Sequence, residues 1–463
     1  MRRFFLIAAI ALTTTMLVTC RNEEPEPDNF YPPENNSADT LDGPGMWRVD
    51  VHSSLTHAQP LAGLVLFADN AKAHPEYNQA ISLEFSYLLP CQCVTGKEGE
   101  EIQYNWKYVE DILDDIASRQ HQAILRIRYT MPGNREVDPA TPGATAVPQY
   151  IKDMEDYHET FNNNDDGPTW YPDWNNSELK WFTKQFILDF TERYNYDARI
   201  AFVEVGFGHW AEYHIYGTEL ILGTNFPSHE YQEEFLHHVS LELRKPWAIS
   251  IDAADDTYTP IVGDPDLLAL NFGLFDDSFM HRMHELSSGD GYNEECWNAL
   301  RYTSRWQHAP MGGEISYYSS YDQRNFLNPD GIYGHTWAEQ AAKYHITFMF
   351  ANNAMQGSFG TPQHYLNGSL QTGYHFKVLD VKTDADSTLI LVTNTGVAPI
   401  YAEMNFSIGQ ISGNDHLENL MPGDTMEAFV YATLTSGDQL KIYSPDVLDD
   451  QEIQYEANVN AKR

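Results

Sequence analysis

Short apolar runs alternate with amphipathic stretches through the middle of the chain. Each run is bounded by Gly, Pro, Asn or Asp, which is typical of strands buried in a parallel sheet. The runs cover residues 61–70, 81–90, 122–131, 199–208, 246–254, 267–275, 309–318 and 345–354. Several intervening stretches have helical spacing, as where Val109, Leu113 and Ile116 fall on one face. Eight strands with helices between most of them predict an α/β fold, a (β/α)8 TIM barrel.

The pattern changes after Gly373, where apolar and polar residues alternate in segments separated by turn residues. Such alternation is typical of antiparallel strands with one buried face, so we expect a smaller C-terminal β-sandwich over residues 373–459. The barrel is then expected over residues 46–365, with the boundary between residues 360 and 373. Between the first two predicted strands, no helical pattern stands out.

Residues 1–20 have the layout of a secretory signal, with a short basic start and a mostly apolar stretch that ends at Cys20. The ending resembles a bacterial lipobox, in which the cysteine receives a lipid; a plain secretory signal is the alternative. Residues 21–45 are acidic and proline-rich at the start, which predicts a disordered tether. The segment resembles the export tract of surface lipoproteins in polysaccharide-utilising bacteria. This implies a lipoprotein on the outer-membrane surface, held to the membrane only by lipid on Cys20.

Acidic residues dominate the charge, with 67 Asp and Glu against 28 Lys and Arg and a net charge of −39. A nucleic-acid-binding surface is therefore not expected, because phosphate contacts need clustered cations. Apart from Cys20, the cysteines are Cys91, Cys93 and Cys296, and they show neither disulfide nor zinc-site spacing. We interpret them as structural, with a bridge to Cys296 as the alternative.

Polar and aromatic residues follow the predicted strands at their C-terminal ends, where parallel barrels place their functional groups. The candidates are Arg128 after strand three; Glu204, His209, Trp210, Glu212 and His214 at strand four; Asp252 after strand five; Glu314, Tyr317 and Tyr318 at strand seven; and Asn352 after strand eight. Asp276 and Asp277 after strand six are interpreted as a turn or cap. Glycosidic cleavage generally needs two carboxyl groups, and aromatic rings stack on sugars, so this set favours carbohydrate chemistry.

Two of these segments resemble known glycosidase-like barrels. Carboxylates after strands four and seven are the arrangement of the retaining clan A glycoside hydrolases. Trp210-Ala211-Glu212-Tyr213-His214 is similar to the Trp-Gly-Glu-Trp-His motif of an uncharacterised family of glycosidase-like (β/α)8 barrel lipoproteins with C-terminal β-sandwiches. Gly312-Gly313-Glu314-Ile315 is similar to that family's strand-seven stretch. The resemblance implies Glu212 as general acid/base and Glu314 as nucleophile.

Alternatives remain open at several of these positions. Glu204 lies nearer the strand than Glu212 and is a second candidate for the acid, or it forms an ion pair with Arg126 or Arg128. The glycines before Glu314 favour close approach of a substrate to that residue. Asp252 is either a ligand for sugar hydroxyls or a helix cap.

The residues Asn162, Asn164, Asp166 and Asp173 fall on the spacing of a calcium loop, but we interpret them as a polar, disordered loop over the barrel mouth, with calcium binding as the alternative. No other metal or cofactor is expected.

The sequence therefore favours a surface-anchored glycoside hydrolase that cleaves a polysaccharide or oligosaccharide, with a retaining mechanism. A non-catalytic glycan-binding lipoprotein on the same scaffold is the alternative. A metal-dependent hydrolase is less favoured, because no HExxH motif is present.

Overall fold

The computed structural model describes residues 45–461. The predicted signal, with Cys20, and residues 21–44 of the predicted tether lie outside the described residues. Within the described range, no helix combines the length and the apolar character that crossing a bilayer requires. The elements below are therefore those of the folded part that follows residue 44.

Eight parallel strands close into a barrel, which confirms the fold predicted from the apolar runs. In chain order they are β3 (Gly63–Phe67), β4 (Leu83–Leu88), β7 (Gln122–Ile127), β10 (Ile200–Val205), β11 (Trp247–Ser250), β12 (Gly273–Phe279), β13 (Met311–Ile315) and β14 (Phe348–Phe350). Each strand pairs with the next in the chain, and β14 closes the barrel on β3.

One strand lies later in the sequence than predicted. The run at 267–275 was expected to be strand six, whereas β12 begins at Gly273. The first part of the run forms the short helix α7 (Pro265–Leu268) instead. Asp264 caps this helix by accepting hydrogen bonds from the backbone of Asp266 and Leu267, and proline at the first helical position favours the same start.

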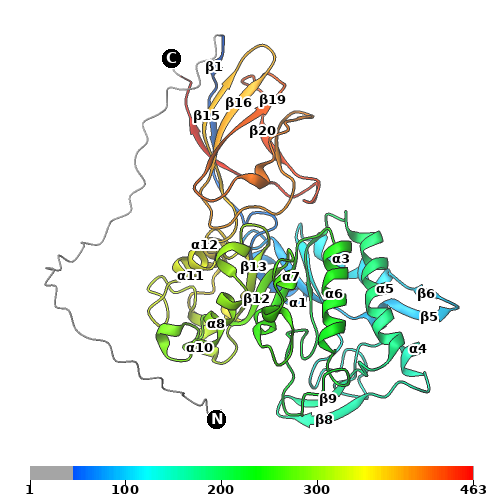
Figure 1. Cartoon of the computed structure of the whole chain (residues 1–463). Coiled ribbons are helices and arrows are strands. Elements are labelled where there is room, and N and C mark those ends of the chain that lie inside the picture. Colours follow the sequence, from blue (N-terminus) through cyan, green and yellow to red (C-terminus); the bar gives the residue numbers. More distant parts are fainter. Residues whose placement is uncertain (1–44, 462–463) are drawn as a thin grey trace, which may run out of the picture. The chain divides into compact units, whose positions relative to one another are not determined.

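Helices and short hairpins connect the strands, and α3, α5 and α6 line the outside of the barrel (Figure 1). The longer helices are α3 (Lys107–Ala117), α5 (Ser177–Tyr194), α6 (His229–Glu242), α8 (Tyr292–Ala299), α11 (Trp337–Lys343) and α12 (Pro362–Ser369). The shorter ones are α1 (Ala68–Ala73), α2 (Pro90–Cys93), α4 (Gln149–Lys152), α9 (Tyr302–Arg305) and α10 (Ser320–Asn325). The hairpins are β5 (Val94–Glu98) with β6 (Glu101–Tyr104), and β8 (Thr160–Asn164) with β9 (Gly167–Tyr171). The helix missing from the predicted pattern between the first two strands is α1, which has only six residues.

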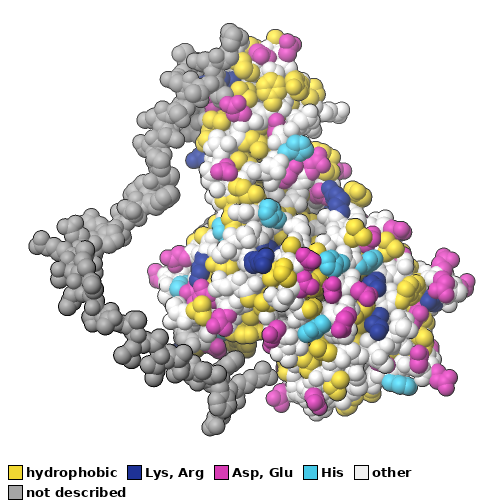
Figure 2. Space-filling model, viewed as in Figure 1, with side chains coloured by type: hydrophobic (Ala, Val, Ile, Leu, Met, Phe, Trp, Pro, Cys, Tyr) yellow, Lys and Arg dark blue, Asp and Glu magenta, His cyan; other side chains and the backbone are white. Residues whose placement is uncertain are grey.

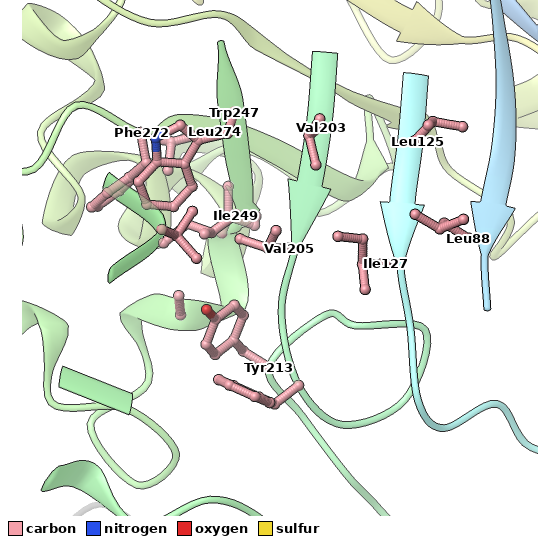
Figure 3. Packing of buried hydrophobic residues seen from close by; sticks show 14 of the residues in the cluster. Leu88, Leu125, Ile127, Val203, Val205, Tyr213, Trp247, Ile249, Phe272 and Leu274 are labelled. Carbon is pink, nitrogen blue, oxygen red and sulfur yellow. The ribbon is translucent and has the colours of Figure 1, made fainter. Parts of the chain in front are cut away.

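Alternating side chains along each strand divide between the helices and the barrel interior. Leu125 and Ile127 of β7 belong to the same outer cluster as Val203 and Val205 of β10, as Figure 3 shows. The intervening residues point the other way. Arg126 of β7 and Glu204 of β10 are register partners and therefore face the interior together.

The C-terminal part forms two sheets, in agreement with the predicted antiparallel pattern. The larger contains β15 (Phe376–Thr383), β16 (Thr388–Asn394), β19 (Thr425–Val430), β21 (Glu456–Val459), β1 (Trp47–Arg48) and β2 (Val51–Ser53). The smaller contains β17 (Asn405–Ile408), β18 (Ile411–Ser412) and β20 (Leu440–Tyr443). All pairs are antiparallel except β15 with β21. Strands β1 and β2 precede the barrel in sequence but pair with β15 and β21.

The three cysteines of the described range are free, so the alternative of a bridge to Cys296 is wrong. Cys93 and Cys296 are buried among apolar residues, in agreement with the structural interpretation. Burial raises the pKa of the Cys91 thiol to about 11, so this group is a poor nucleophile near neutral pH.

Candidate active site

Arg126 brings three acidic side chains together inside the barrel. Its guanidinium lies 2.5 Å from Glu204 through Nε, 2.7 Å from Glu212 through Nη1 and 3.0 Å from Glu314 through Nη2. Although burial opposes it, these carboxylates raise the pKa of Arg126, so the guanidinium remains charged. Carboxylates from β10, from the loop after β10 and from β13 therefore converge on one cation. The ion pair expected for Glu204 is present, with Arg126 as its partner.

A tightly folded loop places Glu212 over the barrel. The amide of His209 donates to the carbonyl of His214, and the amide of Tyr213 donates to the carbonyl of Phe207. Two glycines permit this fold. A Cβ at Gly206 would lie 1.9 Å from the carbonyl oxygen of Ala211, and one at Gly208 would lie 2.3 Å from that of His214.

The same loop holds strained backbone. Trp210, Ala211 and Tyr213 have φ values of 53°, 66° and 60°, a region that residues other than glycine seldom adopt. Strain of this kind is maintained only where the surrounding structure fixes it, and it concentrates at functional sites. Glu212 lies between Ala211 and Tyr213, so its position is set by this strained segment.

The three glutamates differ in their access to solvent. Glu204 is 0% exposed, whereas Glu212 is 6% and Glu314 is 8% exposed. Burial raises the pKa of all three, against the opposing effect of Arg126, and it brings Glu204 to about 7. The pKa of Glu212 rises well above its ordinary value, with Asp277, Glu314 and Asp252 adding to the effect of burial. Protonated and ionised carboxyl groups therefore coexist in this cluster near neutral pH.

A second polar group adjoins Glu212. His214 Nδ1 lies 2.7 Å from Asp252, whose other oxygen accepts a hydrogen bond of 3.1 Å from the Tyr292 hydroxyl. One ligand atom each of Glu212, His214 and Asp277 lies within 4.8 Å of the other two. Burial and the neighbouring carboxylates Asp252 and Asp276 raise the pKa of Asp277 to about 7.

The interpretation of Asp276 and Asp277 as a turn or cap is wrong, because β12 starts late and includes both residues. Asp276 is fully buried on the outer side of the strand, where it accepts hydrogen bonds from the side chains of His284, Asn293 and Trp297. Asp277 alternates with it and faces the site. Asp277 is therefore a site residue that was not among the predicted ones, and the alternation of β12 is the signal that could have identified it.

Other predicted residues surround this cluster in different ways. His209 is buried beside Tyr171, with its Nε2 3.0 Å from the hydroxyl, and burial lowers its pKa to about 3, so it is neutral. Trp210 is half-buried next to the rings of His214 and Tyr216. The structure thus places Trp210 and His214 at the cluster and His209 behind it.

The remaining predicted contacts lie at the periphery. Tyr317 is 45% exposed, and its pKa is raised first by burial of the hydroxyl and then by the nearby Glu314 carboxylate. Tyr318 is 78% exposed and lies beside the ring of His281. Arg128 is buried one layer above Arg126, over the ring of Tyr87, and donates to Glu136. Asn352 accepts hydrogen bonds from the Phe67 amide and the Asn70 side chain, which link the first and last barrel strands.

The segment considered for calcium is a hairpin. Asn162 and Asn164 lie in β8, where their side-chain amides donate to the carbonyls of Gly217 and Tyr216. Asp166 lies in the turn that follows β8. Asp173 lies beyond β9 and accepts hydrogen bonds from the backbone amides of His158, before β8, and Asn175. These residues therefore lie in the hairpin and its flanks, and calcium binding by this segment stays an untested alternative.

The buried Glu204 predicts a pH-dependent stability. Its pKa is raised from 4.5 to about 7, so the folded chain holds this proton more tightly than the unfolded chain does. Ionisation of Glu204 therefore lowers the free energy of unfolding as the pH rises from about 4.5 to about 7. Glu204→Gln removes that charge, so the unfolding free energy of the variant relative to wild type should increase over this range and then level off. Urea unfolding at about pH 5 and about pH 8 measures the difference.

Glu100→Gln, at an exposed position, is the matched control and should show the same difference from wild type at both pH values. A Glu204→Gln difference that stays constant or falls with pH would contradict the assignment of a raised pKa.

No family model matches the chain, and no curated protein matches it either. Similar solved structures include the catalytic domain of a beta-amylase from Paenibacillus polymyxa, with 11% identity, 68% of this chain and 100% of that chain covered, and a TM-score of 0.40. A GH10 structure from Paenibacillus barcinonensis has 12% identity, covers 65% of this chain and 86% of that chain, and has a TM-score of 0.38. The match with the GH39 enzyme from Xanthomonas axonopodis pv. citri has 8% identity, covers 89% of this chain and 94% of that chain, and has a TM-score of 0.38. The chain is thus distantly similar in fold to glycoside hydrolase barrels, and at these scores the likeness carries no argument about activity.

Proposed function

We propose that the protein is a glycoside hydrolase that cleaves a polysaccharide or oligosaccharide through Glu212 and Glu314. One observation carries the proposal: the two carboxylates contact adjacent terminal nitrogens of the Arg126 guanidinium. Residues about a hundred positions apart in the chain therefore meet at the C-terminal side of one barrel, where such enzymes place their acid and nucleophile.

Glu212 is the better candidate for the acid than Glu204. Glu204 is completely enclosed, so no substrate oxygen reaches it, whereas part of the Glu212 side chain is open to solvent. The pKa of Glu212 is raised well above its ordinary value, first by burial and then by Asp277 and Glu314. A carboxylic acid that keeps its proton near neutral pH is what protonation of a leaving oxygen requires. Glu204 acts as a positioning residue, because its contact with Nε fixes the orientation of Arg126.

Glu314 is assigned as the nucleophile. It lies in β13, and its contact with Nη2 of Arg126 favours the ionised form, although burial raises its pKa. A shared guanidinium keeps the two carboxylates close together, and a short separation of about 5–5.5 Å is the requirement for retention of configuration. We therefore propose a retaining mechanism, in which Glu314 attacks the anomeric carbon while Glu212 protonates the departing oxygen. Water, deprotonated by Glu212, then cleaves the bond between the sugar and Glu314 and releases the carboxylate.

Rings and hydrogen-bonding groups near the two glutamates suit a sugar substrate. Trp210 and Tyr317 are partly exposed beside the cluster and offer faces for stacking. Asp252 and His214 form a hydrogen-bonded pair that is suited to binding sugar hydroxyls. Attachment to the outer-membrane surface through lipid on Cys20 remains part of the proposal and rests on the N-terminal sequence alone.

The assignment of Glu212 predicts a dependence on the leaving group. Glu212→Gln should slow the cleavage of a natural glycosidic bond about 10²–10⁴-fold, because the departing alkoxide then receives no proton. With a dinitrophenyl glycoside of that sugar, the variant should form the glycosyl-enzyme nearly as fast as wild type, since dinitrophenolate departs without protonation. Hydrolysis of that intermediate should still be slow, because Glu212 is also the general base for the attacking water. The pre-steady-state release of the leaving group from both substrates measures the contrast.

Glu219→Gln, at an exposed position in the segment that follows β10, is the matched control for these rates. Equal slowing of both substrates by Glu212→Gln would remove Glu212 from the acid role and favour a binding function for this residue.

A further inference from the structure

A second use of the barrel mouth follows from the group beside Glu212. Glu212 and Asp277 each bring a carboxylate oxygen, and His214 brings a ring nitrogen, to within 4.8 Å of one another. The three side chains come from two different elements, the loop after β10 and strand β12. Imidazole and carboxylate groups are the donors that Zn²⁺ and related divalent ions prefer.

The histidine is oriented for this purpose. Its Nδ1 is 2.7 Å from Asp252, and Asp252 is held in turn by the hydroxyl of Tyr292. With Nδ1 held by Asp252, Nε2 is the ring nitrogen that a metal ligand bond would use. A carboxylate behind a histidine is the arrangement that fixes ring orientation and increases ligand basicity at metal sites.

The charge balance also points to a cation. Arg126 is a single cation that contacts three acidic side chains, those of Glu204, Glu212 and Glu314. Asp277 is partly buried and accepts a hydrogen bond of 3.0 Å from the hydroxyl of Ser278, and the described part of the chain places no Lys or Arg beside it. Carboxylates withdrawn from water are usually paired with a cation or bound to a metal, and the acidic groups here outnumber their two basic neighbours, Arg126 and His214.

We infer that the barrel mouth binds one divalent transition-metal ion between Glu212, His214 and Asp277. Zn²⁺ holds nitrogen and oxygen ligands at about 2.0–2.2 Å, so small side-chain rotations bring the three donors onto one ion. Asp252 supports the ion through His214 and does not contact it. Water or a substrate oxygen completes the coordination.

The experiment is titration of the full chain, first treated with a chelator, with Zn²⁺ in a calorimeter, and with Co²⁺ for its visible absorption. One ion should bind per chain, and His214→Gln and Asp277→Asn should each weaken binding at least about tenfold. Asp252→Asn should weaken it about 10–100-fold, as loss of a supporting carboxylate does. Matched controls are His237→Gln and Asp290→Asn, at exposed positions, which should bind as wild type does. Near-ultraviolet circular dichroism checks that each variant is folded.

Absence of Zn²⁺ binding by the wild type would overturn the inference. So would equal affinity in wild type, His214→Gln and Asp277→Asn, because the ion would then lie elsewhere. If one variant fails to fold, the other variant and the Co²⁺ spectrum of the wild type still test whether the ion lies at this site. Nitrogen and oxygen ligands in a low-symmetry site give a spectrum distinct from that of free Co²⁺.

One consequence rests on the proposed function. Glu212 cannot donate a proton while it binds a metal ion, so Zn²⁺ should abolish glycoside cleavage and chelator should restore it. Cleavage at an unchanged rate in the zinc-loaded protein would contradict the shared role of Glu212. A protein that binds Zn²⁺ but cleaves no glycan in either state would instead contradict the proposed function and leave the metal site standing.

Discussion

Glu314→Gln should reduce turnover by at least about 10⁴-fold, the size of loss that removal of a covalent nucleophile causes. The amide has nearly the same shape as the carboxylate and keeps its place beside Arg126, but it cannot attack the anomeric carbon. In contrast to Glu212→Gln, the loss should extend to the dinitrophenyl glycoside, because formation of the glycosyl-enzyme needs the nucleophile whatever the leaving group. Single-turnover rates on both substrates measure it.

Two controls separate chemistry from folding. Glu295→Gln, at an exposed position on α8, should retain wild-type turnover. Glu314→Ala should regain part of its turnover in the presence of azide, a small anion that fits where the carboxylate was removed. If Glu314→Gln retains activity, or if azide leaves the alanine variant inactive while its fold is intact, the nucleophile lies elsewhere.

Arg126→Met should lower the free energy of unfolding by about 3–5 kcal/mol near neutral pH, because removal of one partner of a buried ion pair leaves uncompensated charge behind. Glu204, Glu212 and Glu314 lose their common cation in this variant, and Glu204, when ionised, has no access to water in its place. The loss should be smaller at about pH 5, where these carboxyl groups take up protons. Urea unfolding at both pH values measures the two differences.

Arg282→Met is the matched control, because this arginine is exposed and its loss should change stability by less than about 0.5 kcal/mol. A similarly small change in Arg126→Met would mean that the carboxylates are neutral without the guanidinium, and Arg126 would lose its role as the centre of the site.

The barrel was predictable because buried parallel strands leave a strong local signal. The eight apolar runs mark the strands that close the barrel. The same reasoning failed at residues 267–275, because Leu267 and Leu268 fit a buried helix as well as a strand. The Asp264-Pro265 start, a helix-capping signal, decides between them.

Long-range contacts were less accessible from the sequence. Strands β1 and β2 have two and three residues, too few to show a pattern, and their partners β15 and β21 lie more than three hundred residues away. The candidate site likewise combines residues that a local pattern identifies with contacts that no local pattern predicts. Glu204 and Glu314 were identifiable as strand-end carboxylates, whereas the contact of Arg126 with Glu212 depends on a loop held in strained backbone conformations.

Retaining cleavage by Glu212 and Glu314 is tested by offering the purified full chain a panel of plant, algal and host glycans and following the anomeric protons of the products by NMR. We expect that at least one glycan is cleaved and that the first product has the anomeric configuration of the substrate, with no cleavage by Glu314→Gln. Cleavage of no glycan, or equal cleavage by wild type and Glu314→Gln, would contradict this mechanism.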